Sequence, residues 1–387
     1  MKNKLIRIIL LFLLIPLLCS PFSVALAEEE EQITPSDVLE NLDLSELEKY
    51  YEEIKDNSLA ESDLSDIIYK TVSGENVVKI EDLGEVIWEI LGEKILLFLP
   101  FVVTLISLCV VLSLLGGVTF ETSSSSVLSV VNFAGNLLIS ILVLCQTYYL
   151  ILEISAFSGR ISALSEAVFP ILFTIMSSVG ASGSVGFLSP TVAIFTGTIL
   201  EIASQFMVPA VIVSLVISMI GGLSGSIQLN SLHKLIVDFC EWILKTSFFI
   251  FTAVMVIQGI AVGVSDGITQ RISKFALSKY VPIIGGYLSE GFNYLIASSV
   301  LVKNAIGITS IIMLLIEFLP VFLGITAIKL SLKAVSAVAE PLGLSSTNSM
   351  LNKTAGSLSV LSSIVSGITF LYVIFIAIIM LIGNVVA

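Results

Sequence analysis

The chain has 387 residues, of which 56% are hydrophobic and 13% are charged, and its mean hydropathy is +1.04. Soluble domains average about 25% charged residues, so this composition excludes an ordinary water-soluble enzyme. The formal net charge of −13 also excludes a nucleic-acid-binding chain, because phosphate binding requires a basic surface. The composition predicts an all-α fold, a polytopic bundle of membrane-spanning helices.

The acidic excess lies at the N-terminus. Residues 1–100 contain 8 Lys+Arg and 21 Asp+Glu, whereas the remaining residues contain 10 of each kind. An acidic segment belongs in water, and an apolar, charge-balanced body belongs in lipid. We therefore expect an acidic helical segment at 28–94 and a multi-span body at 95–387.

The first 27 residues are typical of a secretory signal peptide. Basic residues precede an apolar stretch, and Ala25-Leu26-Ala27 matches the small-x-small cleavage pattern. The apolar stretch is shorter than the ~20 residues that a span needs. We expect cleavage, with an uncleaved anchor as the alternative. The acidic segment would then be exported, and we expect its amphipathic helices to pack on the membrane body or on a partner.

The body contains stretches that we interpret as membrane spans: 95–117, 127–151, 167–182, 187–204, 206–223, 247–265, 304–328 and 358–385. The third and fourth are short, and Gly180, Gly183 and Gly186 interrupt their junction, so these two could form a re-entrant pair. Residues 281–300 are ambiguous. We therefore expect about seven to nine spans.

Two stretches, near 226–246 and 267–280, are amphipathic and predict interfacial helices between spans. Counting spans from an exported N-terminus places the first inside the cell, as its lysines favour. The same count places the second outside, although it carries Arg271, Lys274 and Lys279. Either the span count is wrong by one or this basic elbow binds a partner.

Polar residues inside apolar stretches are the candidate functional residues. In the second predicted span, Asn132, Asn136 and Ser140 recur every four residues and share one helix face. Glu317 lies near the middle of the seventh, where a charge is costly unless it is paired, protonated or hydrated. Both features could line a pore or fix helix packing. Three residues lie at seven-residue spacing from Glu317, near its stripe: Lys303, Ser310 and Gly324.

A glycine ladder follows the first amphipathic stretch. Gly259, Gly263 and Gly267 repeat every four residues. Small residues at this spacing allow helix backbones to approach closely. The ladder is compatible with packing inside the chain and with association between copies, and we expect the protein to be an oligomer.

Signals of catalysis are weak. Gly180-Ala181-Ser182-Gly183 matches the GxSG pattern of rhomboid-type intramembrane proteases, which pair the serine with a histidine. The one histidine, His233, lies on a charged amphipathic stretch, so we expect a chance match. The sequence has no Walker A loop, CxxC or HExxH motif. We predict no enzyme activity, no cofactor and no metal site, so any transport must use a gradient or a separate ATPase.

Three sequence blocks and the overall layout resemble one family, the stage III sporulation protein AE family. The blocks are Lys279–Glu290 (KYVPIIGGYLSE), Lys303–Gly307 (KNAIG) and Glu317–Pro320 (EFLP). The resemblance implies a protein of the mother-cell membrane that surrounds the forespore. It implies partners encoded in the same operon, among them a secretion-type ATPase, and a forespore-side protein across the intermembrane space. Together these would form a channel or secretion-like conduit, with no catalytic residues implied.

Three functional hypotheses follow. The chain is a channel-type subunit of this sporulation complex, a self-sufficient secondary transporter, or a scaffold without a pore. In the transporter hypothesis, the interrupted region 167–204 would hold the substrate near the membrane midplane. In the scaffold hypothesis, substitutions on the polar faces would be tolerated.

Overall fold

The computed structural model describes residues 35–40, 42–55, 64–73, 80–122, 125–223, 229–280 and 285–386. These residues form helices, turns and short connections and contain no strand. Three short helices come first: α2 (Pro35–Glu40), α3 (Ser45–Lys55) and α4 (Leu64–Val72). Long helices follow: α5 (Ile80–Thr122), α6 (Ser125–Ser178), α7 (Ser182–Glu201), the π-helical η1 (Ile202–Met207), α8 (Val208–Leu223), α9 (Asn230–Tyr280), α10 (Gly285–Ala339) and α11 (Ser345–Val386).

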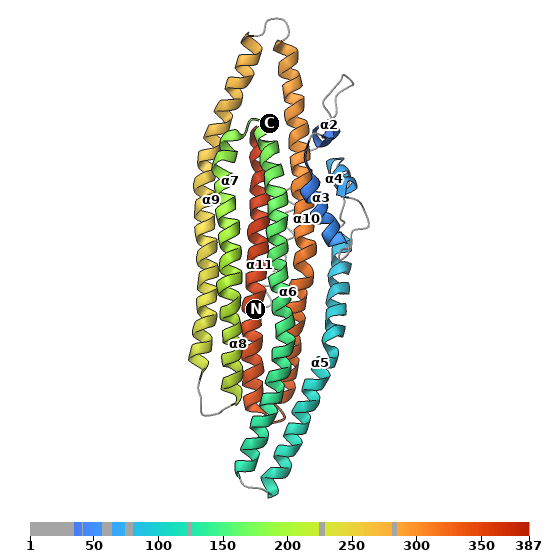
Figure 1. Ribbon diagram of the computed structural model, residues 1–387, viewed down its shortest axis with the longest axis vertical. Helices are drawn as coiled ribbons and strands as arrows, with labels where there is room; N and C mark the ends of the chain where they lie inside the picture. The colour runs from blue at the N-terminus through green and yellow to red at the C-terminus, as the bar shows by residue number, and fades with distance from the viewer. Residues whose placement is uncertain are drawn as a thin grey trace.

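The long helices run up and down in one elongated bundle (Figure 1). α11 contacts α6, α7, α8, α9 and α10, whereas α5 lies at the edge against α6 and α10. At 1.5 Å per residue, the 55 residues of α10 extend over about 80 Å. The hydrocarbon core of a bilayer is only about 30 Å thick. The longest helices are therefore more than twice as long as a membrane crossing requires.

Five stretches of helix in the described part of the chain are long and apolar enough to cross a membrane: Ile87–Gly116, Ser129–Ser178, Ser182–Leu223, Tyr294–Ala339 and Ser345–Ile382. They support a membrane protein, but the expected count of seven to nine spans is not confirmed. Pairs of predicted spans have merged. Spans 127–151 and 167–182 both lie on α6, and η1 joins 187–204 to 206–223.

The expected loops are helical because their residues are compatible with a helix. On α6, the charges and serines that interrupt the apolar pattern between 152 and 166 find partners on the helix surface or on neighbouring helices. Low hydropathy at this point marks a change of surroundings, not the end of a helix. The same holds for the stretches expected near 226–246 and at 267–280 as separate interfacial helices: residues 230–246 and 267–280 belong to the continuous α9, and 226–228 lie outside the described residues.

The predicted re-entrant pair is a helical hairpin between the end of α6 and the start of α7. Its turn lies at 179–181, and Gly180 has a φ of +85° there, a conformation that glycine adopts readily. Gly183 and Gly186 lie inside α7 and do not break it. Two of the three glycines were therefore misinterpreted as breakers.

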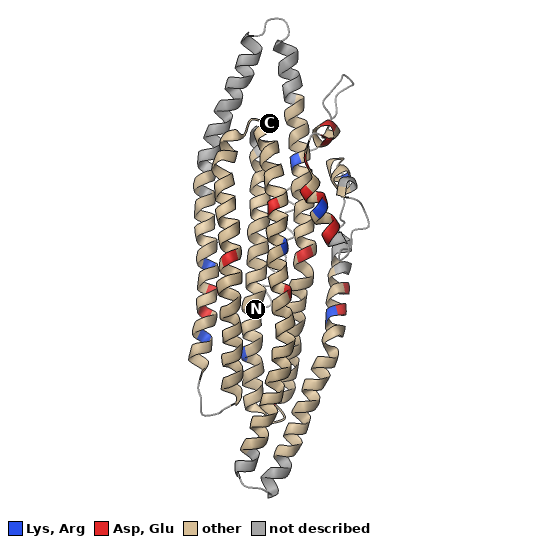
Figure 2. Cartoon of the chain, viewed as in Figure 1, with Lys and Arg blue, Asp and Glu red and all other residues tan. Residues whose placement is uncertain are grey.

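The acidic N-terminal helices pack on the side of the bundle. α2 and α4 contact α10, and α3 contacts α6. Their buried residues are apolar or aromatic: Leu47, Tyr50, Tyr51, Leu64, Ile67 and Ile68. Burial of each such side chain contributes about 1.5–3 kcal/mol. The acidic residues of α2 and α3, whose positions are red in Figure 2, are exposed. The predicted signal peptide, residues 1–27, lies outside the described residues.

Candidate functional site: a buried ion pair and a polar seam

Glu317 on α10 is paired with Arg160 on α6. The Arg160 guanidinium donates from Nε to Oε2 of Glu317, and the exposed fractions of the two side chains are 38% and 8%. The carboxylate is thus nearly enclosed, whereas the arginine still reaches the surface. Sequence analysis identified Glu317 as a candidate but not Arg160, which lies between two predicted spans. The two residues are 157 positions apart, and no local pattern connects them.

The N-terminal segment reaches this ion pair through Tyr50 of α3. The Tyr50 side chain is 4% exposed, and its hydroxyl has no hydrogen-bond partner in the described structure. Burial raises the pKa of Tyr50 above its ordinary value, and the nearby Glu317 carboxylate raises it further. The phenol of Tyr50 therefore stays neutral under ordinary conditions, and its aromatic ring packs next to the ion pair.

A second ion pair lies seven residues before Arg160 along α6. Lys94 Nζ on α5 lies 3.6 Å from Oε1 of Glu153. A Cβ atom at Gly324, seven residues after Glu317 on α10, would lie 3.7 Å from Oε2 of the same glutamate. The two pairs form a charged band across α5, α6 and α10. The second pair is partly exposed, so its contribution to stability is about 1 kcal/mol or less.

The remaining residues of the predicted Glu317 stripe are enclosed as well. Lys303 is 0% exposed, and its Nζ donates to the backbone carbonyl of Met380 on α11 at 2.8 Å. Ser310 is also buried and donates to the carbonyl of Ile306 on its own helix at 2.6 Å. The stripe at seven-residue spacing therefore faces the bundle interior, and its members have separate partners.

Polar residues on α6, α8 and α11 form what we call the polar seam: Asn136, Ser140, Ser214, Ser218, Thr347, Thr354 and Ser357. Thr347 Oγ1 donates to Oδ1 of Asn136 at 2.6 Å. Ser140 donates to the Asn136 carbonyl at 2.7 Å and lies 3.2 Å from the sulfur of Met350. Asn132 lies one turn before Asn136 and is half-buried. Asn136 and Ser140 thus lie between packed helices.

The seam continues to α9 through His233. Ser214 Oγ lies 2.9 Å from Nδ1 of His233 and 3.1 Å from Oγ of Ser357. Ser214 and Ser357 are both 0% exposed. Ser182 of the GxSG match begins α7 at one end of the bundle, whereas His233 lies in the first turn of α9 at the other (Figure 1). The two cannot form a catalytic dyad, and the serine that does contact His233 is closed to a substrate.

The glycine ladder and the first family block lie where the structure describes the backbone at most. Gly259, Gly263 and Gly267 lie on α9, but their surroundings fall outside the described residues, as do those of 279–290. Among the residues that can be described, no group of three His, Cys, Asp or Glu side chains could hold a metal ion.

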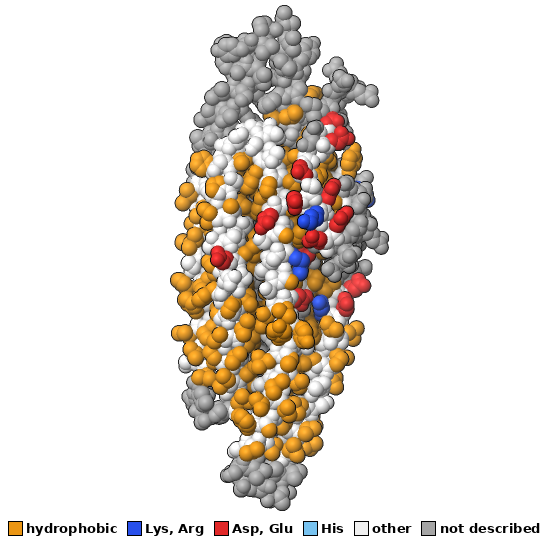
Figure 3. All heavy atoms as spheres, in the orientation of Figure 1, with side chains coloured by type: hydrophobic (Ala, Val, Ile, Leu, Met, Phe, Trp, Pro, Cys, Tyr) orange, Lys and Arg blue, Asp and Glu red, His pale blue; other side chains and the backbone are white. Residues whose placement is uncertain are grey.

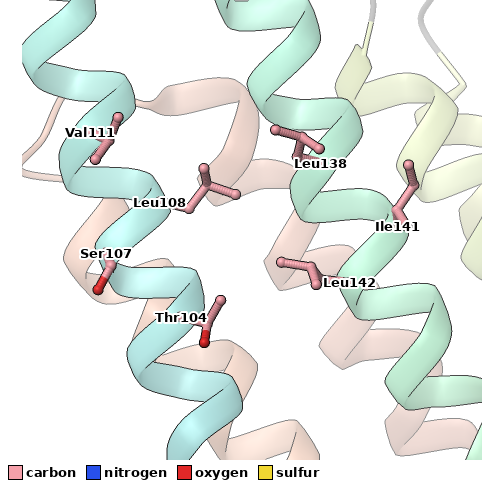
Figure 4. Close-up of a pocket in the computed structure, with 7 residues that line it drawn as sticks. All are labelled: Thr104, Ser107, Leu108, Val111, Leu138, Ile141 and Leu142. Carbon is pink, nitrogen blue, oxygen red and sulfur yellow. The ribbon is translucent and has the colours of Figure 1, made fainter.

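An apolar groove runs between α5 and α6 near the edge of the bundle (Figure 4). It has a volume of about 400 Å³ and is lined by Thr104, Ser107, Leu108, Val111, Leu138, Ile141 and Leu142. Thr104 Oγ1 donates to the Pro100 carbonyl on its own helix at 2.8 Å. The groove therefore presents a hydrocarbon-like surface.

The family model of stage III sporulation protein AE matches residues 62–383. Stage III sporulation protein AE of Bacillus subtilis (strain 168) is 25% identical over 206 residues, which are 50% of this chain and 51% of that protein. The alignment thus spans about half the length of this relative. No solved structure matches the chain. The range matched by the family model includes the ion pair and the polar seam but not Tyr50.

Proposed function

Because the chain belongs to the stage III sporulation protein AE family, we propose that it is the multi-pass, channel-type membrane subunit of a sporulation complex. This complex would link the mother cell with the forespore and support late forespore development. Its other subunits would include a secretion-type ATPase and a forespore-side protein across the intermembrane space. The observation that carries the proposal is the family match over residues 62–383, and the membrane-length apolar helices support it.

The outward face of α6 supports a membrane position for one half of the bundle. From 130 to 152, every exposed residue is apolar: Val130, Phe133, Ala134, Leu137, Leu138, Ile141, Leu144, Cys145, Tyr148, Tyr149 and Leu152. From 155 to 178, the exposed residues are small or polar: Ser155, Ala156, Gly159, Ala163, Glu166, Pro170, Thr174, Ser177 and Ser178. The apolar part is about 34 Å long at 1.5 Å per residue, which matches the thickness of the hydrocarbon core.

The exposed surfaces of the neighbouring helices also become apolar at this level along the bundle. On α5, Trp88 is exposed before the Lys94–Glu153 pair, and a run of exposed aliphatic residues begins at Ile95, directly after that pair. Exposed residues of α8 are apolar, and hydrophobic side chains gather over this half in the view of Figure 3. Tyr148 and Tyr149 lie near the boundary, as aromatic residues do at membrane interfaces. We call the half with these apolar faces the membrane half and the other half the outer half.

The docked acidic segment indicates an orientation. The acidic helices pack near Arg160 and Glu317, beside the outer half. The connections from α8 to α9 and from α10 to α11 lie at the opposite end, which would then be the cytoplasmic side. With the N-terminal segment outside, the basic elbow at 267–280 lies far along α9 from those connections. In this orientation the elbow would be too distant from the membrane to influence orientation, so its basic residues would not conflict with the preference of basic residues for the cytoplasmic side.

The packing of the polar seam favours a subunit over a self-sufficient transporter. Asn136 and Ser140 are buried and hydrogen-bonded, so within one chain they bind helices together instead of lining an open path. The segment 187–204 is continuous with 206–223, without the broken helix that a transporter site requires. A conduit would therefore form between chains. The same packing favours the non-conducting scaffold as the second candidate.

The test is a chromosomal Glu317→Leu substitution in a spore-forming host that carries this chain. We expect spore yield to fall at the stage of late forespore gene expression, while the protein still accumulates in the membrane. Ser155→Ala, a change at an exposed position of α6, is the control and should leave the yield unchanged. A normal spore yield from a deletion of the whole gene would contradict the proposed function.

A further inference from the structure

One face of α11 is polar throughout the membrane half. Between 345 and 366, every residue that is not buried is Ser, Asn, Gly or Lys. Seven of these follow a three-to-four-residue spacing and form one stripe along the helix: Ser345, Ser349, Asn352, Gly356, Ser359, Ser363 and Ser366. We call this set the α11 stripe. Beyond 366 the pattern stops, and the less buried residues include Phe370, Ile374 and Leu381.

Polar and charged residues of the two neighbouring helices border the α11 stripe. On one side, Asn352 Nδ2 donates to Oγ of Ser336 on α10 at 2.7 Å. Lys329 and Lys333 lie two turns and one turn before Ser336, and Lys333 is exposed. On the other side, Lys353 donates to Asn230 at the start of α9. The exposed residues at the start of α9 are mixed: Lys234 and Asp238 lie beside exposed Leu232, Leu235 and Phe239.

The depth of this face is fixed by contacts with α6. Thr347 bonds Asn136 and Met350 contacts Ser140, so the first turns of α11 lie level with 136–140 of α6. At this level the outward face of α6 carries Leu137, Leu138 and Ile141. The membrane half therefore has an apolar face on α5 and α6 and, on another side, the polar α11 stripe with Lys333 of α10 beside it.

An exposed lysine at bilayer depth is too costly to face hydrocarbon and therefore faces water or other protein. Ser359 and Ser363 of the stripe donate to carbonyls of their own helix and are compatible with such surroundings. Leu330, Ala334 and Ala337 on α10 are exposed next to Lys333, so the polar face ends at an apolar edge. Such an edge suits contact with another helix, whereas the stripe itself offers hydroxyls and ammonium groups. This combination fits a surface whose apolar edge on α10 contacts other protein and whose polar α11 stripe contacts water.

We propose that the α11 stripe lines a water-filled path enclosed by further copies of this chain, with Lys329 and Lys333 at its rim. The proposal deepens the proposed function and rests on it for the placement of the membrane half. It moves the lining away from Asn132, Asn136, Ser140 and Glu317. The two lysines make the path attractive to anions and to acidic groups of a polar cargo.

The test is cysteine accessibility in membranes of sporulating cells that contain the full complex. Ser349→Cys and Gly356→Cys probe the stripe, and a Cβ atom at Gly356 meets nothing within 4 Å. Ile141→Cys is the matched control, because it lies at the depth of Ser349 on the opposite face. Leu358→Cys probes a side chain that is 0% exposed on the same helix. The native Cys145 is exposed on the apolar face and serves as an internal reference.

A charged, membrane-impermeant thiol reagent should modify Ser349→Cys and Gly356→Cys at least tenfold faster than Ile141→Cys, Leu358→Cys or Cys145. Equally slow reaction at Ser349→Cys, Gly356→Cys and Ile141→Cys would overturn the hydrated path and leave the membrane role standing. Equally fast reaction at Ser349→Cys and Ile141→Cys would show that this half is not in lipid. That result would overturn the membrane placement on which the proposal rests.

Discussion

The Arg160–Glu317 pair predicts an asymmetric response to substitution. Arg160→Met leaves a carboxylate that is 8% exposed without its partner, whereas Glu317→Gln leaves an arginine that is 38% exposed and can turn to water. Loss of one partner of a buried pair costs about 3–5 kcal/mol, and loss of a partly exposed one costs about 1 kcal/mol. We therefore expect Arg160→Met to cost about 3 kcal/mol and Glu317→Gln about 1 kcal/mol.

The assay is the apparent unfolding temperature of the detergent-purified protein. At about 2 °C per kcal/mol, Arg160→Met should lower it by about 6 °C and Glu317→Gln by about 2 °C. The double variant Arg160→Met/Glu317→Leu removes both charges and should recover most of the loss, because no buried charge remains. Equal losses in the two single variants, or no recovery in the double variant, would refute the reasoning.

Three further predictions concern the body of the bundle. Thr347→Val removes the donor to Asn136 and should cost about 1 kcal/mol in the same unfolding assay, with no added cost in an Asn136→Leu background; additive losses would contradict the bond. Gly135→Val should destabilise strongly, because a Cβ atom there lies 2.1 Å from an α5 leucine, whereas Gly159→Val, whose Cβ meets nothing within 4 Å, should be tolerated; equal effects would mean that α5 does not pack on α6 as described. Lys333→Glu should shift the selectivity of the reconstituted complex from anions toward cations, measured as a reversal potential in a salt gradient, and an unchanged potential would remove this lysine from the conduit.

The helical class and the membrane character were predictable because they depend on composition. The docking of the acidic segment was foreseen in outline, since Leu47 and Tyr50 share a helix face that needs a partner. Sequence reasoning could not decide between the bundle and a separate protein as that partner. Such a choice depends on tertiary contacts that leave no local pattern.

The span count was not predictable, because a hydropathy window reports the surroundings of a segment and not its continuity. On α6, a drop in hydropathy between two apolar stretches marks the point where one unbroken helix passes from an apolar to a polar outer face. The α11 stripe was missed for a related reason. The predicted span 358–385 began after the first of the periodic serines, so the stripe was divided between a span and the residues before it.

Candidate residues were easier to identify than their partners. Asn136 and Glu317 stood out because polar groups are rare in apolar stretches. Their partners, Thr347 and Arg160, lie 211 and 157 residues away along the chain. A single sequence contains no signal that joins positions so far apart, and the choice between packing and pore lining depends on that information.

Solute flux through liposomes tests the central claim most directly. The full-length protein would be reconstituted alone and together with the other subunits of its operon, with assembly verified on the same samples. The account predicts no flux from the protein alone and clear flux from the assembled complex, reduced by modification of Ser349→Cys with a charged thiol reagent. An assembled complex that conducts nothing would contradict the channel-type role and favour the scaffold.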